Sequence, residues 1–443
     1  MRKSYYILIG IAAALLLAVG VYYLPPVHAS LAWRLDDLRT RIKYYFNPPE
    51  QALFLPTQRA TSSALPTVTP PATRTPTLTA TPLPPEVPTP TPTITLTPLP
   101  VSVKLPGVKY VDQKGRWNYC GPANLTMALN FWGWKGNRDD VAKAIKPGVQ
   151  DPNLDFITQG KTDKNVMPYE MVNFVNDQTK FRALYRLGGE IDLLKRMIAA
   201  GFPVVAEKGY YEKDYAGKLG WLGHYQFVTG YDDTQGVLIV QDTWNDGPNY
   251  RIPYPLFEEG WRSFDFLFIV VYPPDRESQV MALLGDWSDS HWAAGHALDI
   301  ANQDVHTLTG IDEFFAWFAK GTSHVALLQY VDAAYAYDYA FQLYANLGAD
   351  DKQRPYRSMW YQTGPYWAYY YSGRYSDVIS LADTTLNDTI SEPSLEESLY
   401  WRALAEYALG DTNSAYADIR RAVYLNKNFQ AALDIMGQWG IGP

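Results

Sequence analysis

Asn118–Leu129, NYCGPANLTMAL, holds the only cysteine among the 443 residues of the chain. A Gly-Pro pair follows Cys120, and Leu125 and Leu129 then recur at helical spacing; proline suits the first turn of a helix. Unpaired N–H groups at a helix N-terminus favour the thiolate, which is the nucleophilic form of cysteine. The sequence therefore predicts an activated Cys120 at the start of a helix rather than a small buried apolar side chain.

A nucleophilic thiol needs a base, and one histidine is placed to supply it. Of the six histidines, His224 alone belongs to the predicted strands, in GHYQFVTGYDD. The next predicted strand, GVLIVQDTW, contains Asp242. A simple hairpin around DDTQG puts Asn245 opposite His224, so that Asp242 reaches the ring only through a bulge or a shifted turn. Asn245 is therefore the competing orienting residue. Gly220 and Gly223 are expected to leave room for a substrate backbone.

The pattern around these residues changes from helical to extended. Besides the helix after Cys120, NVMPYEMVNFVND and EIDLLKRMIAAG read as short helices. Four strands follow, FPVVAEKG, HYQFVTGYD, GVLIVQDTW and DFLFIVVYP, which are rich in β-branched and aromatic residues. Helices followed by antiparallel strands predict an α+β domain over residues 103–275.

Three blocks carry a family resemblance: NYCGPANLTMAL, GHYQFVTGYDD and VLIVQDTWN are similar to those of the peptidase C39-like family, a branch of the papain-like cysteine peptidases. The resemblance implies a papain-like fold, with Cys120 as nucleophile and His224 as general base. It favours Asp242 over Asn245 as the residue that orients His224. It also implies a glutamine upstream of the nucleophile that binds the oxyanion. Gln113 is the candidate, although it lies one residue farther from Cys120 than the family pattern leads us to expect.

The C-terminal part, residues 276–443, is expected to be all helical. Its stretches share a small residue or glycine, a polar turn and an amphipathic helix, and Gly373 and Gly410 fall at similar places in two of them. This pattern resembles tetratricopeptide repeats with loose spacing. Such repeats could recruit a protein partner.

The N-terminal part predicts attachment to a membrane. Residues 5–24 carry no charge and follow Arg2 and Lys3, which is typical of a membrane anchor; a cleaved signal peptide is the alternative for residues 1–29. An amphipathic juxtamembrane segment is expected over 30–55. Residues 56–102 are expected to form a disordered linker, since 56–100 alone hold 13 prolines and 14 threonines. This linker is expected to space the later domains away from the membrane.

These expectations together predict a membrane-tethered extracellular cysteine peptidase that acts on peptides or proteins, or its secreted form. Two alternatives remain: an inactive module that binds peptides or cell-wall material, and a transpeptidase or amidase with the same triad. The net charge of −8 and the absence of a basic cluster argue against nucleic-acid binding. No cofactor is expected, and no metal, since His291 and His296 are spaced i,i+5 and do not share a helix face.

Overall fold

The computed structural model describes residues 2–24, scattered positions from 27 to 46, and 52–57, 98–116, 118–146, 165–213, 219–347, 354–387 and 395–442. Most of the predicted juxtamembrane segment and of the Pro/Thr-rich linker lies outside these ranges. Helix α1 spans Arg2–Tyr22. Within the described ranges, no helix combines the length and the apolar character that crossing a membrane requires. The membrane-spanning helix therefore stays a prediction.

One antiparallel sheet organises the first half of the molecule. In the described part it has seven strands, with β2-β7-β3-β4-β5-β6 in order and β1 added beside β4. The predicted α+β class with an antiparallel sheet is confirmed. The strands are β1 Ser102–Lys104, β2 Arg182–Arg186, β3 Val204–Lys213, β4 Leu219–Asp232, β5 Val237–Gln241, β6 Tyr250–Pro253 and β7 Phe268–Tyr272.

Helices cover both faces of this sheet because strand residues alternate between two apolar cores. Val205 and Phe227 belong to a core shared with helices α3 and α6, whereas Val204 and Val228 belong to a second core shared with α7 and α8. Successive apolar side chains of β3 and β4 thus point to opposite faces, and these strands are buried on both sides. The helices of this half are α3 Cys120–Phe131, α4 Arg138–Ile145, α6 Pro168–Gln178, α7 Ile191–Ala199 and α8 Tyr254–Arg262.

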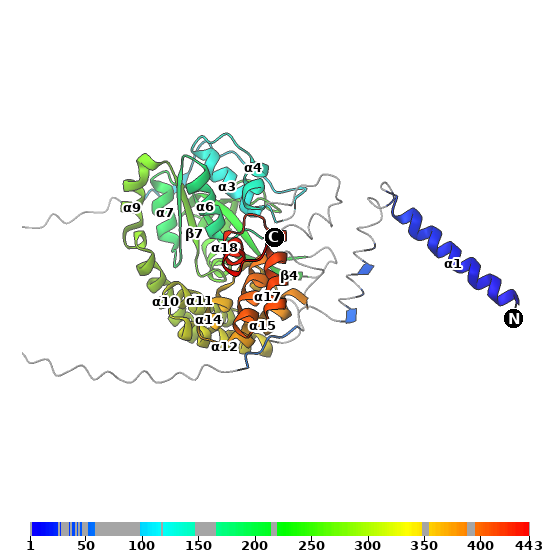
Figure 1. Cartoon of the computed structure of the whole chain (residues 1–443). Coiled ribbons are helices and arrows are strands. Elements are labelled where there is room, and N and C mark those ends of the chain that lie inside the picture. The colour runs from blue at the N-terminus through cyan, green and yellow to red at the C-terminus, as the bar shows by residue number, and fades with distance from the viewer. Residues whose placement is uncertain are drawn as a thin grey trace, which may run out of the picture.

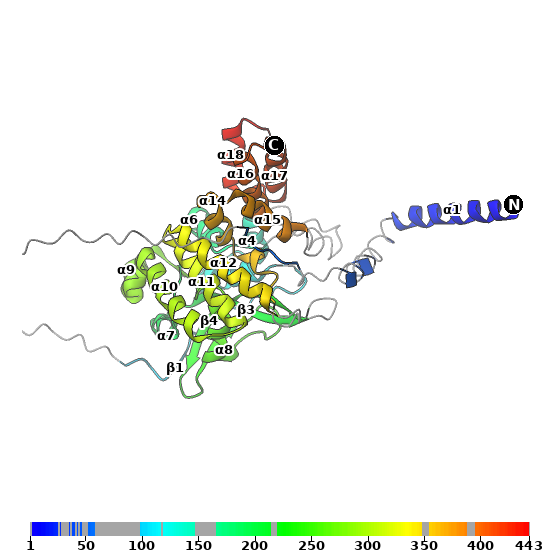
Figure 2. The same cartoon turned by 90° about the horizontal axis from the view of Figure 1, so that it is seen from below.

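The C-terminal half is helical throughout its described ranges, as the sequence predicts. Its arrangement is consistent with helical repeats, while the closer likeness to tetratricopeptide repeats stays a prediction. Figure 2 shows α14 to α18 extending away from the sheet. The helices are α9 Glu277–Leu284, α10 Ser290–Thr307, α11 Ile311–Ala326, α12 Tyr330–Asn346, α13 Ser358–Tyr361, α14 Gly364–Tyr371, α15 Tyr375–Asn387, α16 Glu396–Ala408, α17 Thr412–Leu425 and α18 Gln430–Trp439, with short 3-10 turns η2 Pro274–Arg276 and η3 Gly285–Ser288.

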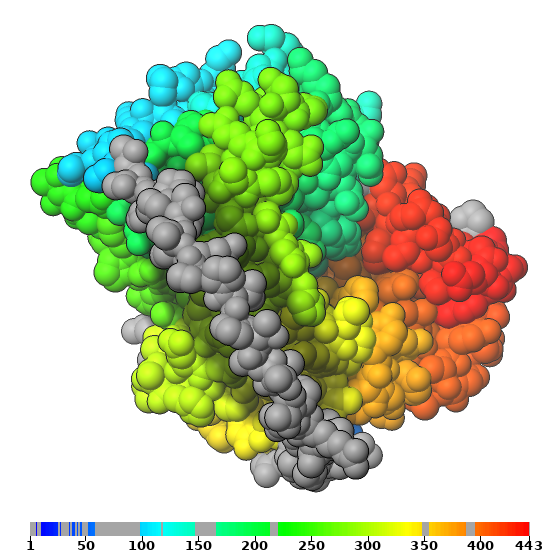
Figure 3. Space-filling view, turned by 90° about the vertical axis from the view of Figure 1, so that its left-hand side faces the viewer, coloured from blue at the N-terminus to red at the C-terminus, as the bar shows by residue number. Residues whose placement is uncertain are grey.

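The two halves share one hydrophobic core. Leu125 of α3 and Phe227 of β4 fall in the same buried cluster as Phe315, Tyr337 and Trp401 of the helical half. Figures 1 and 3 show the helices from α10 onward packed against the sheet-bearing half in one continuous body. The helical half is therefore in a position to shape the functional site rather than only to flank it.

Candidate active site

Cys120 is the first residue of α3, as the sequence predicts. The chain enters the helix through Asn118, whose φ of 46° is unusual for a residue other than glycine. Lys146 holds this entry, since its Nζ donates to the carbonyl of Asn118 at 3.2 Å and lies 4.6 Å from the centre of the Tyr119 ring. No side chain caps the N-terminus of α3. The N–H groups of Cys120 and Gly121, the first two residues of the helix, therefore remain available to a negative charge at the sulfur.

Asn124 fixes the start of α3 against the strand that carries the predicted base. Its Nδ2 donates to the carbonyl of Cys120 and to the carbonyl of Tyr225 in β4, each at 2.8 Å, and the side chain is fully buried. Because Tyr225 directly follows His224, one amide group sets the spacing between the helix that carries the thiol and the strand that carries the imidazole.

A β-bulge decides which acid meets His224. Gly230 pairs with Ile239, which is the register of the simple hairpin, but Val228 pairs with Val240 and Phe227 with Gln241. The extra residue in β4, Thr229, moves the partner strand by one position. Asp242 therefore falls beside Gln226 and on the face of His224. This bulge is the feature that the sequence analysis required for Asp242 to contact His224.

Asp242 orients the imidazole and also closes the turn that follows β5. Its Oδ2 accepts from His224 Nε2 at 3.0 Å and from Gln226 Nε2 at 2.8 Å. Its Oδ1 accepts backbone N–H bonds from Trp244 at 2.9 Å and Asn245 at 3.1 Å. Asn245, the competing candidate, uses its side chain to donate to Glu212. The structure thus brings Asp242 to His224 and leaves the Asn245 side chain engaged elsewhere.

The electrostatics of the three groups favour a thiolate–imidazolium pair. Burial alone would raise the pKa of the Cys120 thiol, but a hydrogen bond to His224 and the charge of His224 outweigh burial and lower it. Burial would likewise lower the pKa of His224, but Asp242 and then Cys120 raise it. Against its own burial, the pKa of Asp242 is held well below its ordinary value, chiefly by His224. Because Nε2 faces Asp242, Nδ1 is the ring nitrogen left for the sulfur.

Gln113 is clamped to the residue after Asp242. Its backbone N–H donates to the carbonyl of Thr243 at 2.9 Å, and its side-chain Oε1 accepts from Thr243 Oγ1 at 2.7 Å. This bond occupies the oxygen end of the amide and leaves Nε2 as the donor end. The structure therefore connects Gln113 to the turn that holds Asp242, next to the site.

The space expected beside Gly220 and Gly223 is filled by the helical half, so that expectation is wrong. A Cβ atom on Gly220 would lie 2.7 Å from an Arg357 guanidinium nitrogen, and one on Gly223 would lie 2.7 Å from the Phe264 ring and 2.9 Å from the Tyr361 ring. Burial raises the pKa of Tyr361, and the nearby Cys120 thiolate adds to the increase. These glycines are needed because the segment that contains α13 packs against β4. That segment places Tyr361 near Cys120 and Gly223.

The sequence did not predict several contacts that position the site residues. Asn124 lies one helical turn after Cys120, a spacing that could have suggested a contact. Two-residue spacing on one strand predicts that Gln226 shares the face of His224, but it does not predict that Gln226 donates to Asp242. Tyr361 carried no sequence signal, because its contact joins residues far apart in the chain.

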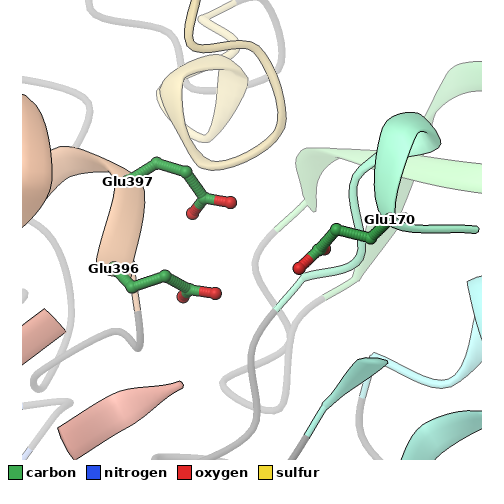
Figure 4. Close-up of side chains that lie close together, drawn as sticks. All are labelled: Glu170, Glu396 and Glu397. Carbon is green, nitrogen blue, oxygen red and sulfur yellow. The ribbon is translucent and has the colours of Figure 1, made fainter. Parts of the chain in front are cut away.

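A separate cluster of acids lies where the two halves meet. Figure 4 shows Glu170 of α6 facing Glu396 and Glu397 of α16, and the potential ligand atoms of the three lie within 4.8 Å of one another. Asn426 donates to Glu396 at 2.8 Å, and Tyr169 donates to Glu397 at 3.3 Å. Protein donors therefore engage these carboxylates, and the cluster links α6 to α16.

Comparisons with known proteins gave several solved structures and one family model. A search of the curated proteins found no match. Among solved structures, a protein of Bacillus anthracis described as a C39-like peptidase is 19% identical, with a TM-score of 0.30, over 38% of this chain and 96% of that one. The peptidase domain of Streptococcus ComA, a bifunctional ABC transporter involved in a quorum-sensing pathway, is 17% identical, with a TM-score of 0.27, over 38% and 98%.

Xylellain, a cysteine protease from Xylella fastidiosa, is 17% identical, with a TM-score of 0.26, over 40% of this chain and 87% of its own. The family model that matches spans residues 106–268 and therefore contains Cys120, His224, Asp242 and Gln113. Residues 106–268 of this chain match the Peptidase_C39 like family.

Proposed function

We propose that this chain is a cysteine peptidase in which Cys120, His224 and Asp242 act as one unit. The observation that carries the proposal is the chain of contacts among them. Asp242 accepts from His224 at 3.0 Å, and His224 in turn lowers the pKa of the Cys120 thiol. The sulfur lies at the start of a helix, which further favours its negative charge.

The proposed reaction is acyl transfer through a thioester. The Cys120 thiolate attacks the carbonyl carbon of a peptide bond, and a C–S bond forms while the carbonyl oxygen becomes an oxyanion. The His224 imidazolium then gives its proton to the leaving nitrogen as the C–N bond breaks. Neutral His224 next takes a proton from water, whose oxygen attacks the thioester. The acid product leaves, and the thiolate–imidazolium pair is restored.

The oxyanion needs hydrogen-bond donors, and the chain offers two candidates. One is the backbone N–H of Cys120 in the first turn of α3, which has no acceptor within its own helix. The other is Nε2 of Gln113, since Thr243 occupies the oxygen end of that amide. Losing one such donor typically costs about 10²–10³-fold in kcat.

Hydrolysis of a diverse peptide library, followed by mass spectrometry, tests the activity. We expect cleavage by the native chain and none by Cys120→Ala, whereas His291→Ala, in the exposed first turn of α10, should cleave normally. Binding of peptides without cleavage would favour the inactive binding module instead. Products whose mass includes an added amine would favour a transpeptidase.

We also propose that α1 attaches the chain to a membrane, with the body on the extracellular side. This part rests on the sequence pattern, because α1 carries no charge after Lys3. If the proposal holds, the native chain should stay in the membrane fraction after an alkaline wash, and deletion of residues 2–24 should release it.

A membrane-impermeant maleimide, added to intact cells, then reports the side, since Cys120 is the only thiol. Labelling that requires lysis would contradict an extracellular body. A mass lacking the first residues would indicate a cleaved signal peptide.

A further inference from the structure

A short stretch from before the Pro/Thr-rich region lies against the helical half. In the described segment Ala52–Thr57, the Phe54 ring packs edge-on against Phe341 of α12 at 4.9 Å and near Tyr369 of α14 at 5.8 Å. Only 4% of Phe54 is exposed. Figure 1 shows this segment, in blue, beside α12 and α15. A large aromatic side chain is thus buried by helices nearly 300 residues later in the chain.

A buried carboxylate fixes the end of the segment. Asp377, in the first turn of α15, is 2% exposed, and Arg374 donates to its Oδ2 at 2.8 Å. Its Oδ1 accepts from both the backbone N–H and the hydroxyl of Thr57, at 2.8 and 2.7 Å. Within the described part of the chain, both hydrogen bonds to Asp377 Oδ1 come from Thr57. A buried carboxylate oxygen without hydrogen-bond donors destabilises the fold. Asp377 Oδ1 therefore favours a residue such as Thr57, which provides two donors.

Phe341, Tyr369 and Asp377 line the groove that holds the segment. Phe54 is buried, while its neighbours Leu53 and Leu55 are 41% and 50% exposed, so alternate side chains point inward. Next to Phe54 the helical half forms a pocket whose walls include Tyr344, Met359 and Leu381. An aromatic anchor, alternation and a terminal hydrogen-bonding acceptor are the features of a peptide-binding site.

The far end of the Pro/Thr-rich region is also attached to the body. The carbonyl of Pro100 accepts from the Tyr231 hydroxyl at 2.7 Å, and β1 pairs with β4 from Ser102 onward. Residues 58–97 thus connect two points that both rest on the folded body.

We propose that the helical half contains a peptide-binding site whose ligand is this chain's own Ala52–Thr57. While the site is filled, the chain is attached to α1 through the helical half, and the Pro/Thr-rich region does not separate the body from α1. The contact is small, but a ligand on the same chain is present at an effective concentration on the order of millimolar. Peptides that offer an aromatic residue and, three residues later, a threonine or serine would compete for this groove. The proposal does not depend on peptidase activity.

Distance measurement between two spin labels in the full chain tests the proposal. In a Cys120→Ser background, Leu55→Cys labels an exposed position of the segment and Val101→Cys, 63% exposed, labels the far side of the Pro/Thr-rich region. We expect one narrow distance distribution. A free connection of this length would instead spread widely around a value on the order of 40 Å or more.

Variants in the segment decide the outcome. Phe54→Ala, and to a smaller degree Thr57→Val, should convert the narrow distribution into the broad one, while Leu53→Ala at a solvent-facing position should leave it narrow. A broad distribution in the parent chain would overturn the proposal. So would a narrow one that neither Phe54→Ala nor Thr57→Val changes.

Discussion

The two carboxylate oxygens of Asp242 accept hydrogen bonds from different groups, and this determines which substitutions can replace the residue. Oδ2 faces two side-chain donors, His224 and Gln226, while Oδ1 faces backbone N–H groups that include those of Trp244 and Asn245. A carboxylate accepts on both sides, but an asparagine amide accepts on only one. Whichever way an asparagine turned, its NH₂ group would meet other donors.

We therefore expect Asp242→Asn to lower kcat/KM by about 10²–10⁴-fold, the usual range for lost acid–base assistance. The loss has two causes: the charge that raises the pKa of His224 disappears, and the turn after β5 loses acceptors. Steady-state cleavage of a substrate from the peptide library measures the effect. Asp246→Asn, in the same turn, is the matched control and should retain most activity. Equal activity of Asp242→Asn and the native chain would show that the contact with His224 is not used.

Among single helices and strands, the sequence predicted those that carry Cys120, His224 and Asp242, but not the contact between them. Apolar periodicity and turn residues located α3, α6, α7 and the strands that hold His224 and Asp242. The register did not follow from these signals, because a one-residue bulge at Thr229 leaves the apolar pattern of β4 intact. The strands β1 and β6 were missed because they have three and four residues, too few for alternation to be recognised. The strand β2, RALYR, was missed because it lacks the β-branched residues that mark β5 and β7.

Asn124 is the link between α3 and β4, and its loss should affect both stability and reactivity. Asn124→Ala removes two hydrogen bonds, to Cys120 and to Tyr225, and should cost about 1–3 kcal/mol of unfolding free energy. It should also slow alkylation of Cys120, because the sulfur and the imidazole lose their fixed spacing. Asn137→Ala, which uncaps α4, provides a comparison, since it removes hydrogen bonds from a side chain of the same type away from the site. If both variants alkylate at the native rate, Asn124 is only structural.

Asp265 links the turn before β7 to α11 and gives the fold a pH dependence. It is buried and accepts from Ser323 at 2.7 Å, and burial raises its pKa from 3.8 to about 7. An acid with a raised pKa in the folded state binds its proton more tightly there than when unfolded. Its contribution to stability is therefore present at low pH and is lost as pH rises from about 4 to about 7.

Asp265→Asn removes this titration and should raise stability above pH ~7 by on the order of 2–4 kcal/mol, with little change near pH ~4. Urea unfolding of the native chain and the variant at the two pH values measures the difference. A constant difference across this range would mean that Asp265 does not titrate within it.

In the molecule as a whole, the helical half places the Tyr361 side chain next to Gly223 and near Cys120. Domain-by-domain reading of the sequence treated it as a separate unit, because no local pattern reports that Tyr361 lies against Gly223. Three of the four predicted site residues, Cys120, His224 and Asp242, by contrast, come from blocks whose order in the chain is informative by itself. What could not be predicted is the contribution of side chains that reach the site only when the two halves share a core.

Tyr361→Ala should therefore change substrate use more than thiol chemistry. Removing the ring opens space beside Gly223, so we expect the KM or the side-chain preference of the library substrates to change several-fold while alkylation of Cys120 by a small reagent stays near the native rate. Tyr371→Ala, which truncates an exposed tyrosine of α14, serves as the control. A uniform loss of alkylation and cleavage would instead point to a folding defect.

We infer that His224 holds Cys120 as a thiolate, and the pH dependence of Cys120 alkylation is the test of this inference, because no other thiol competes. We predict that the native chain reacts at nearly its full rate well below the ordinary thiol pKa of about 8.5, and that His224→Gln moves the inflection back to that value or higher. A native inflection at or above about 8.5 that His224→Gln leaves in place would contradict the account.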